Sequence, residues 1–487
     1  MARTLAALPE RVTAFAEPAI QAMARTVSSL VLVIALIGAN PDWPARDTGL
    51  SAEDLSSPAL WPDDPGYAPG PDCRGQWGLF SFVPACAGAA VDRTGAQVDR
   101  AWLWTTGRPD VIIAVANDGI NPSERDLITQ WRLNARELQP PAGADVHDVN
   151  GDGAFDVRDY TTATGTETPT IDRVFALDLL QRPDRGDANG NGLLDPQDIL
   201  QIYADGRDDD GNGYIDDICG WDFVDDDPDP FVEDAQPAID ATRAALARAN
   251  DGVGVAGVCP RCRGLPLRVS RSGASTPMAL ALAVLHAVDH EARVVMIDAA
   301  AWGDRPELHA AADYANARRS VVMVGAGRTG GARAPTTWPA DRVLRVGSIG
   351  PDNTNFARAQ RFDAKDACSS SEVSLTAPGR CDDIGLGIVA GVAGLVWTAA
   401  AGLEDRDVAP WPSPPSASTV RGLLLAQAKT LTVGKASTLG LPSTRPSPAS
   451  PRLWRTSRIH PTLPLSILLA RRLSNFARAF RKTDKRR

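Results

Sequence analysis

Short apolar runs alternate with helix-like segments through the middle of this 487-residue chain. The runs typical of buried strands are Val111–Ala116, Leu265–Val269, Val294–Ile297, Val321–Val324 and Leu344–Ile349. The helix-like segments are Ala279–Ala287, Glu307–Ala315 and Gly385–Ala401. Because strands that are apolar on both faces need cover on both faces, the pattern predicts an α/β fold in which helices enclose a mostly parallel sheet.

Charge is spread unevenly along the chain. The hydrophobic share of 44% and the charged share of 23% are typical of a globular protein. The net charge is −10, with the acidic residues concentrated between Asp145 and Asp234 and a basic stretch from Arg452 to Arg487. This balance argues against a general nucleic-acid binder. The dense acid predicts an insertion at about 140–230 that binds metal or is simply solvated.

The two ends of the chain have compositions of their own. An apolar run, Val27–Ala39, follows scattered arginines and is shorter than the about 20 residues that cross a membrane. It predicts a signal peptide or signal anchor at 1–39, and hence a secreted or cell-envelope protein. Residues 40–72 have the composition of a linker, 73–433 form the predicted domain, and 434–487 form a Pro/Ser-rich basic tail. That tail is either a basic helix with weak membrane contact or a solvated end.

The seven cysteines fall into local pairs with one left over. The pairs are Cys73 with Cys86, Cys259 with Cys262, and Cys368 with Cys381, which leaves Cys219 alone. Three local pairs suit an oxidising compartment. The Cys259-Pro-Arg-Cys262 run is open to a redox pair, half a zinc site or a structural disulfide. The disulfide is favoured because no second pair lies close in sequence.

Three acidic segments repeat one spacing of oxygen-bearing side chains around a glycine. Oxygen ligands at positions 1, 3 and 5, followed by glycine at position 6, wrap a hard cation, so the spacing predicts Ca²⁺ sites. The alternative is a solvated acidic loop. The candidate ligands are Asp148, Asn150, Asp152, Asp156 and Asp159 in the first segment, Asp187, Asn189, Asn191, Asp195 and Asp198 in the second, and Asp208, Asp210, Asn212, Asp216 and Asp217 in the third.

Several segments, in order, resemble one known family. They are Gln76–Leu79, Ala101–Asp110, Asp205–Asp217 with Gly220–Phe223, Asn250–Val258 and Val389–Val396. Together they are similar to the subtilases, the subtilisin-like serine proteases, over roughly Gln76 to Lys429. The resemblance implies a subtilisin-like three-layer domain. It also implies an Asp, a His and a Ser for catalysis and an Asn in the oxyanion hole.

At those catalytic positions the chain departs from the family. Counting from the matching segments places Asn117 at the Asp position, Pro237 at the His position, Asp383 at the Ser position and Arg328 at the oxyanion position. Acyl transfer needs a nucleophile and a base, but Pro237 can neither hold nor give a proton, and an ionised Asp383 is a poor acyl carrier. The histidines, His147, His286, His290, His309 and His460, are expected on the surface or in the tail.

These losses predict a family member without peptidase activity. It would be an exported, calcium-stabilised domain that binds a peptide or a protein, with no role in nucleic-acid binding. Two alternatives remain open: an active subtilisin-like endopeptidase whose triad lies elsewhere, and a structural calcium-binding protein of the cell envelope. A histidine within reach of a serine would favour the first, and the lack of any specific ligand would favour the second.

Overall fold

A computed structural model describes the greater part of the chain. The described residues are 39–69, 75–82, 95–162, 187–233, 239–271, 274–299, 305–325, 338–339, 341–349, 374–378, 384–403 and 409–427. Several predictions therefore lie outside the described residues: the signal segment before residue 39, the tail, the pairs Cys73–Cys86 and Cys368–Cys381, and the positions Pro237, Arg328 and Asp383.

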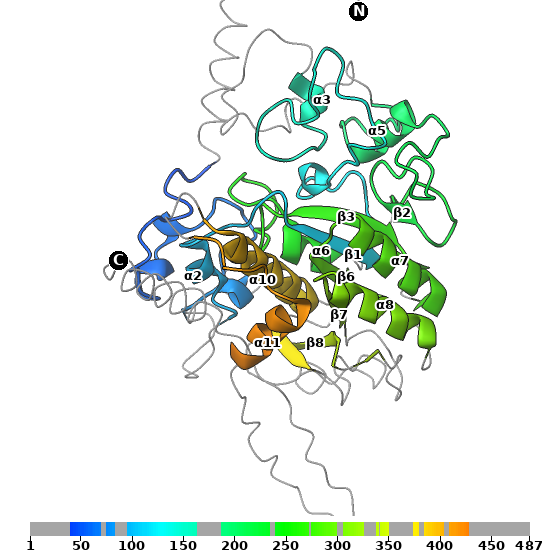
Figure 1. Ribbon diagram of the computed structural model, residues 1–487. Coiled ribbons are helices and arrows are strands. Elements are labelled where there is room, and N and C mark those ends of the chain that lie inside the picture. The colour runs from blue at the N-terminus through cyan, green and yellow to red at the C-terminus, as the bar shows by residue number, and fades with distance from the viewer. Residues whose placement is uncertain are drawn as a thin grey trace, which may run out of the picture.

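A seven-stranded parallel sheet forms the centre of the molecule (Figure 1). Its strands lie in the order β2-β3-β1-β6-β7-β8-β9. Their bounds are β1 Ile112–Asn117, β2 Trp221–Asp222, β3 Arg263–Arg268, β6 Val294–Ile297, β7 Val321–Gly325, β8 Val343–Ile349 and β9 Leu375–Pro378. A separate hairpin pairs β4, Ser270–Arg271, with β5, Ala274–Ser275. The predicted α/β class is confirmed, and the predicted apolar runs form the central strands.

Helices cover both faces of the sheet. On one face lie α6, Ile239–Leu246, α10, Ile384–Ala401, and α11, Ala417–Gln427; on the other lie α7, Pro277–Asp289, and α8, Pro306–Ala317. Alternation along β1 sends Ile113 and Val115 toward the α6 and α10 face, while Ile112 and Ala114 point to the α7 and α8 face. Asn117 therefore belongs to the α6 and α10 face.

Local chemistry starts the helices that flank the sheet. Thr276 caps α7, its hydroxyl accepting the Ala279 N–H at 3.0 Å, and Pro277 follows at the first helical position. Helix α8 also begins with a proline, Pro306, but its cap residue Arg305 makes no side-chain capping bond. Both helices run back antiparallel to the strands, so the C-terminal end of α7 lies where β6 begins.

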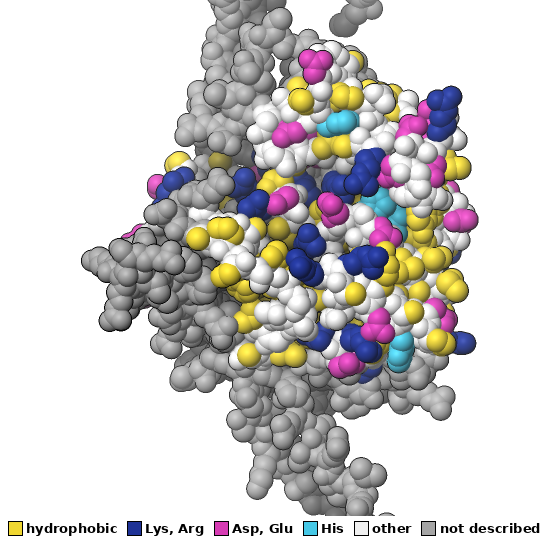
Figure 2. All heavy atoms as spheres, viewed as in Figure 1, with side chains coloured by type: hydrophobic (Ala, Val, Ile, Leu, Met, Phe, Trp, Pro, Cys, Tyr) yellow, Lys and Arg dark blue, Asp and Glu magenta, His cyan; other side chains and the backbone are white. Residues whose placement is uncertain are grey.

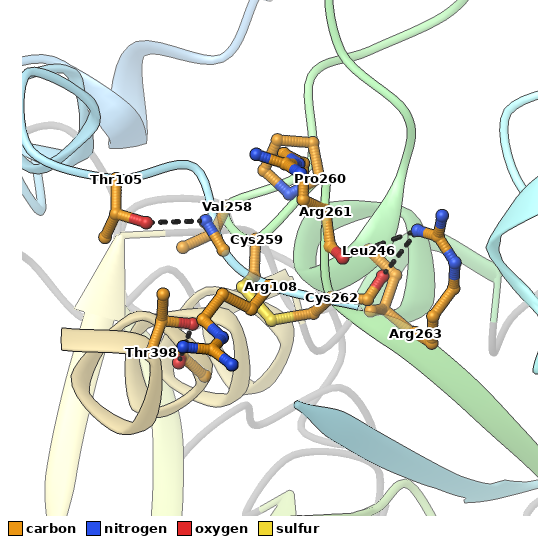
Figure 3. The surroundings of a disulfide bond; sticks show 12 residues. Thr105, Arg108, Leu246, Val258, Cys259, Pro260, Arg261, Cys262, Arg263 and Thr398 are labelled. Carbon is orange, nitrogen blue, oxygen red and sulfur yellow. Dashed lines mark hydrogen bonds between the residues drawn. A yellow bond between two sulfur atoms is a disulfide. The ribbon is translucent and has the colours of Figure 1, made fainter. Parts of the chain in front are cut away.

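Glycines bring α10 close to its neighbours. A Cβ at Gly387 would lie 2.0 Å from the carbonyl oxygen of Ala241 on α6, so only glycine permits this approach. At Gly394 a Cβ would lie 2.9 Å from the sulfur of Cys262, which is bonded to Cys259 (Figure 3). Helix α10 is long and apolar enough to cross a membrane, but 89% of it is buried inside the protein, so it serves as the core helix.

The two cysteines of the Cys259-Pro-Arg-Cys262 run are paired with each other. Both cysteines are fully buried beside α10, and their sulfur atoms are bonded to each other (Figure 3). Cys219, predicted to be unpaired, is a buried free cysteine. A buried pair against the core helix fits the predicted structural disulfide better than a redox pair.

The segment with a linker composition packs onto the domain in its described part, residues 40–69. Tyr67 is 1% exposed and its ring meets that of Phe80 at 5.0 Å between centroids. Asp64 accepts the N–H of Asn250 at 2.8 Å, and the N–H of Gly66 donates to the carbonyl of Gly254 at 2.7 Å. Pro, Asp and Gly here form tight turns that carry aromatic anchors, a tertiary role that composition does not reveal.

The described part of the acidic insertion, residues 134–162 and 187–220, lies outside the layers of the sheet (Figure 1). In its described part it carries short helices, α3 at Asp159–Thr162 and α5 at Pro196–Tyr203. It ends earlier than the predicted boundary near 230, because Trp221 and Asp222 already pair with Leu267 and Arg268 of β3. The rest of the domain, with its sheet and helices, is called the α/β body below.

Candidate functional site

Asn117 occupies the end of β1, where the family resemblance expects an aspartate. Its side chain is fully buried, and its Oδ1 accepts the N–H of Gly119 at 2.9 Å. Among the described residues its Nδ2 has no hydrogen-bond partner. The neighbouring carboxylate of Asp118 bonds to the hydroxyl of Ser270. A neutral carboxamide cannot balance the charge of an imidazolium, so this site lacks the electrostatic part of a triad.

The histidines lie elsewhere. Strands β1 and β6 pair in parallel from Ile113 with Val294 to Ala116 with Ile297. The residues just before Val294 therefore lie at the N-terminal ends of the strands, and Asn117 lies at the C-terminal ends. Strand β1, which separates the two ends, is about 16 Å long at about 3.3 Å per residue. His286 and His290 lie at the N-terminal ends of the strands. A general base must approach within about 3.2 Å of its partner, so neither serves a reaction at Asn117.

The two other described histidines are also remote from a catalytic role at Asn117. His309 is on α8, which covers the opposite face of the sheet. His147 belongs to the insertion, where its ring meets Phe155 at 4.9 Å between centroids and its Nε2 lies 2.9 Å from the carbonyl of Leu138. Within the part of the chain that the structure describes, no histidine accompanies Asn117.

The expectation that His286 and His290 are surface residues is wrong. They are 2% and 9% exposed, and their rings stack with centroids 4.0 Å apart. Both face Asp217: its Oδ2 lies 3.0 Å from Nε2 of His290 and 3.7 Å from Nε2 of His286. The two histidines are buried because the acidic insertion covers the C-terminal end of α7. The spacing of residues along α7 does not predict this contact.

The electrostatic environment differs between the two histidines. Burial, helped by the nearby charge of His290, lowers the pKa of His286 well below its usual value. Burial also acts to lower the pKa of His290, but the hydrogen bond and charge of Asp217 outweigh it and raise that pKa. His290 is thus the ring that carries a proton more readily, while His286 stays neutral.

The three acidic segments adopt one local structure. In each, the carboxylate at position 1 accepts the N–H of the glycine at position 6, at 2.8 to 3.0 Å, as the pairs Asp148 with Gly153, Asp187 with Gly192 and Asp208 with Gly213 demonstrate. Side-chain oxygens at positions 3 and 5 accept the N–H groups two residues further on in all three segments. The predicted spacing therefore curls each backbone around its own oxygen atoms.

The first two segments also share their closure. Asp159 accepts the N–H groups of Val149, Asn150 and Asp156, at 2.9 to 3.2 Å. Asp198 at the equivalent position accepts those of Ala188, Asn189 and Asp195, at 2.7 to 3.0 Å. Position 12 thus ties the two ends of each loop together, and both carboxylates are fully buried.

Arginines reach into the first segment. Arg158 contacts Asp152 at 2.6 Å and Asp156 at 2.5 Å, and Arg263 from β3 lies 3.5 Å from Asp156. Burial acts to raise the pKa of Asp156, but the two guanidinium groups outweigh it and hold that pKa below its usual value. Asp156 is therefore committed to an ion pair with Arg158 of its own segment and, at longer distance, with Arg263 of the body. In the second segment the equivalent Asp195 instead caps α5.

The third segment gathers a different set of oxygens. Asp208 and Asp210 come together with Glu137, with one carboxylate oxygen of each within 4.8 Å of the others. Glu137 was not among the predicted ligands; burial raises the pKa of its carboxyl to about 7. The predicted ligands Asp216 and Asp217 are not in this group: Asp216 accepts the N–H groups of Asp205 and Gly206, and Asp217 accepts from Asn212 and faces the histidines.

Comparison with known proteins points in one direction. Residues 108–439 match the model of the subtilase family. The chain is 31% identical over 133 residues to the thermophilic serine proteinase of Bacillus sp. (strain AK1), and 35% identical over 114 residues to thermitase of Thermoactinomyces vulgaris. These matches cover 27% and 23% of this chain, and only 33% and 40% of the two relatives. A solved prenylagaramide maturation protease has a TM-score of 0.39 and 14% identity, over 76% of this chain and 98% of that one.

Proposed function

The chain belongs to the subtilase family, and on that premise we propose that it is a catalytically inactive member that binds a peptide or a protein. The observation that carries the proposal is Asn117, a buried carboxamide at the end of β1 with its Nδ2 unpartnered among the described residues. The family resemblance puts Pro237 at the position of the base and Asp383 at the position of the nucleophile. Pro237 cannot take up a proton, and an ionised Asp383 is a poor acyl carrier.

The position of the histidines supports the same proposal. His286 and His290 lie at the N-terminal ends of the strands, opposite to Asn117, and His309 is in the helix layer on the other face of the sheet. A peptidase with an alternative triad would need one of them within hydrogen-bond reach of a serine beside the cleft. What the family fold retains without this chemistry is a framework with a vestigial cleft suited to holding an extended chain.

A cleavage assay tests the proposal. The purified full chain, saturated with calcium, is incubated with casein, with fluorogenic peptides and with a fluorophosphonate probe, using thermitase as the positive control. We expect neither turnover nor covalent label. Turnover together with a label would establish the alternative, an active endopeptidase, and the labelled residue would identify the nucleophile. An Asp383→Ala variant is the matched control, since it should behave as the parent does.

We also propose that calcium stabilises the acidic insertion. Support comes from the shared curl of the three segments and from the oxygen atoms of Glu137, Asp208 and Asp210 close together in the third. Oxygen ligands of this kind suit Ca²⁺. The first two segments would hold the ion with their own side chains, and the third would add Glu137 from outside the segment. Calorimetry should record heat on calcium addition, and a chelator should lower the melting temperature. Silence in both measurements would refute the idea.

Export and partners complete the proposal. The apolar run before residue 39 and the bond between Cys259 and Cys262 support a secreted or cell-envelope location, which fractionation and N-terminal sequencing of the mature protein would test. Lys and Arg are mixed with Asp and Glu over the visible face, which favours a peptide or protein partner over nucleic acid (Figure 2). Weak membrane contact is assigned to the basic tail, and flotation of the full chain against one ending at residue 433 would measure it.

Affinity capture separates this binding function from a purely structural one. A specific peptide or protein retained by the calcium-loaded chain supports the binding function. The structural envelope protein predicted as an alternative would retain none, while its melting temperature would still depend on calcium.

A further inference from the structure

Three side chains of the kind that bind transition metals meet where the acidic insertion contacts α7. Asp217 lies just before β2, His286 lies on the last turn of α7, and His290 is the residue that caps its C-terminal end. All three are buried, and one ligand atom of each lies within 4.8 Å of the others. Figure 1 places α7 next to β2, at the edge of the sheet that the insertion covers. The spacing of four residues puts both imidazoles on one face of the helix.

We propose that Asp217, His286 and His290 bind a Zn²⁺ ion. Zinc bonds to imidazole nitrogen and carboxylate oxygen at about 2.0–2.2 Å, so two ligand atoms of a tetrahedral site lie about 3.3–3.5 Å apart. Oδ2 of Asp217 lies 3.0 Å from Nε2 of His290 and 3.7 Å from Nε2 of His286, on either side of that value. The ligand atoms of the two histidines lie within 4.8 Å of each other, and the stacked rings must turn to direct both nitrogens at one ion.

The surroundings orient two of the three ligands. Nδ1 of His290 lies 2.9 Å from the carbonyl oxygen of His286, and the N–H···O bond formed there leaves Nε2 as the ligand atom. Asn134 donates to Oδ1 of Asp217 at 2.8 Å, and Asn212 donates to Oδ2 at 2.9 Å. Such outer contacts are what hold ligands of metal sites in place.

His286 is the independent observation that points to a ligand. Its side chain is fully buried, and neither ring nitrogen has a hydrogen-bond partner among the described residues. Leaving a buried polar group unpaired costs about 1–3 kcal/mol. An ion pair between Asp217 and a protonated His290 accounts for those two residues, but it leaves His286 without a partner. A metal ion satisfies the nitrogen that faces Asp217.

The charges around the three ligands are balanced. The Arg132 guanidinium donates to the carbonyl of His290 at 2.8 Å and opposes a cation. Carboxylates offset it, because Asn134 bridges Asp217 to Asp210, and Glu137 accepts the N–H of Asp210. Imidazole suits Zn²⁺ but not Ca²⁺, which takes oxygen ligands. The zinc ion would thus tie the insertion to α7 beside the third calcium segment, whose Asn212 donates to Asp217, and its role would not depend on peptidase activity.

Zinc titration of the full chain, in saturating calcium after removal of transition metals with phenanthroline, tests the proposal. We expect one zinc ion per chain. The same preparation with Co²⁺ should acquire the visible absorption band of a four-coordinate cobalt site. His286→Gln and Asp217→Asn should each weaken zinc binding by more than about 100-fold, since even outer-contact changes cost 10- to 100-fold. His309→Gln, on α8, is the matched control and should bind zinc as the parent does.

Two outcomes would overturn the zinc site. One is the absence of both stoichiometric zinc binding and the cobalt band in the parent protein. The other is zinc binding that survives in the folded His286→Gln protein. If the variants fail to fold, the cobalt spectrum of the parent protein decides alone. Because calcium is present throughout, loss of the calcium segments and loss of the zinc site give different results.

Discussion

The α/β body and the acidic insertion share one apolar core but differ in the polar side chains that they bury. In the body, apolar side chains from both helix layers meet an apolar sheet, and α10 is buried along nearly its whole length. In the insertion, fully buried side chains include the carboxylates of Asp156, Asp159, Asp195 and Asp198. Both regions contribute apolar side chains to the core, but the insertion also buries several carboxylates, so packing changes and charge changes should affect the two regions differently.

The largest effect is expected from an arginine of the insertion. Arg158→Gln leaves the fully buried Asp156 with only the longer contact to Arg263, and removing one partner of a buried pair costs about 3–5 kcal/mol. Urea unfolding in calcium measures the loss. Arg108→Gln is the matched control, because its ion pair with Asp110 is exposed and worth less than about 1 kcal/mol. Equal losses in the two variants would contradict the importance of buried charge.

A packing change should disrupt the body almost as strongly. Gly387→Ala brings a Cβ to 2.0 Å from the carbonyl of Ala241, and overpacking of this kind costs about 1–3 kcal/mol, here at the upper end because backbone must move. Gly422→Ala on α11 meets nothing within 4 Å and should stabilise the helix by about 0.5–1 kcal/mol. Thermal melts of the two variants should shift in opposite directions, and a shift of the same sign would show that packing at α10 is looser.

Removing calcium should destabilise the insertion and leave the body unchanged. At a calcium concentration about 100 times its dissociation constant, the ion contributes about 2.7 kcal/mol. Chelation should therefore speed hydrogen exchange by about 100-fold at the amides of Gly153, Gly192 and Gly213, which donate to the position-1 carboxylates. Amides of β1 and β6 should keep their protection. Uniform loss of protection would mean that the insertion and the body unfold together.

The smallest effect belongs to a helix cap of the body. Thr276→Ala removes the bond to the Ala279 N–H at the start of α7 and should cost about 1 kcal/mol. Arg305→Ala, at the equivalent position of α8, removes no capping bond and should change stability little. Denaturant midpoints measure both. A larger loss at Arg305 would place the stability of these helices in contacts other than their caps.

Patterns local in sequence predicted much of the architecture. Apolar runs indicated the central strands, since a strand buried on both faces must be apolar throughout, and β6 has the predicted bounds Val294–Ile297. The repeated spacing around glycine indicated three curled segments, because those hydrogen bonds join residues only two to five positions apart. The family resemblance also follows from short segments in the same order as in the family, and these segments align Asn117 with the position of the catalytic Asp.

Contacts between distant segments needed the folded chain. Asp217 meets His286 and His290 across about 70 residues of sequence, and no periodicity on α7 predicts that an insertion covers its C-terminal end. Glu137 joins Asp208 and Asp210 in the same way, and residues 40–69 pack as part of the domain despite a linker composition. Spacing encodes the bonds that a segment makes with itself, whereas burial depends on which distant surface arrives to exclude water.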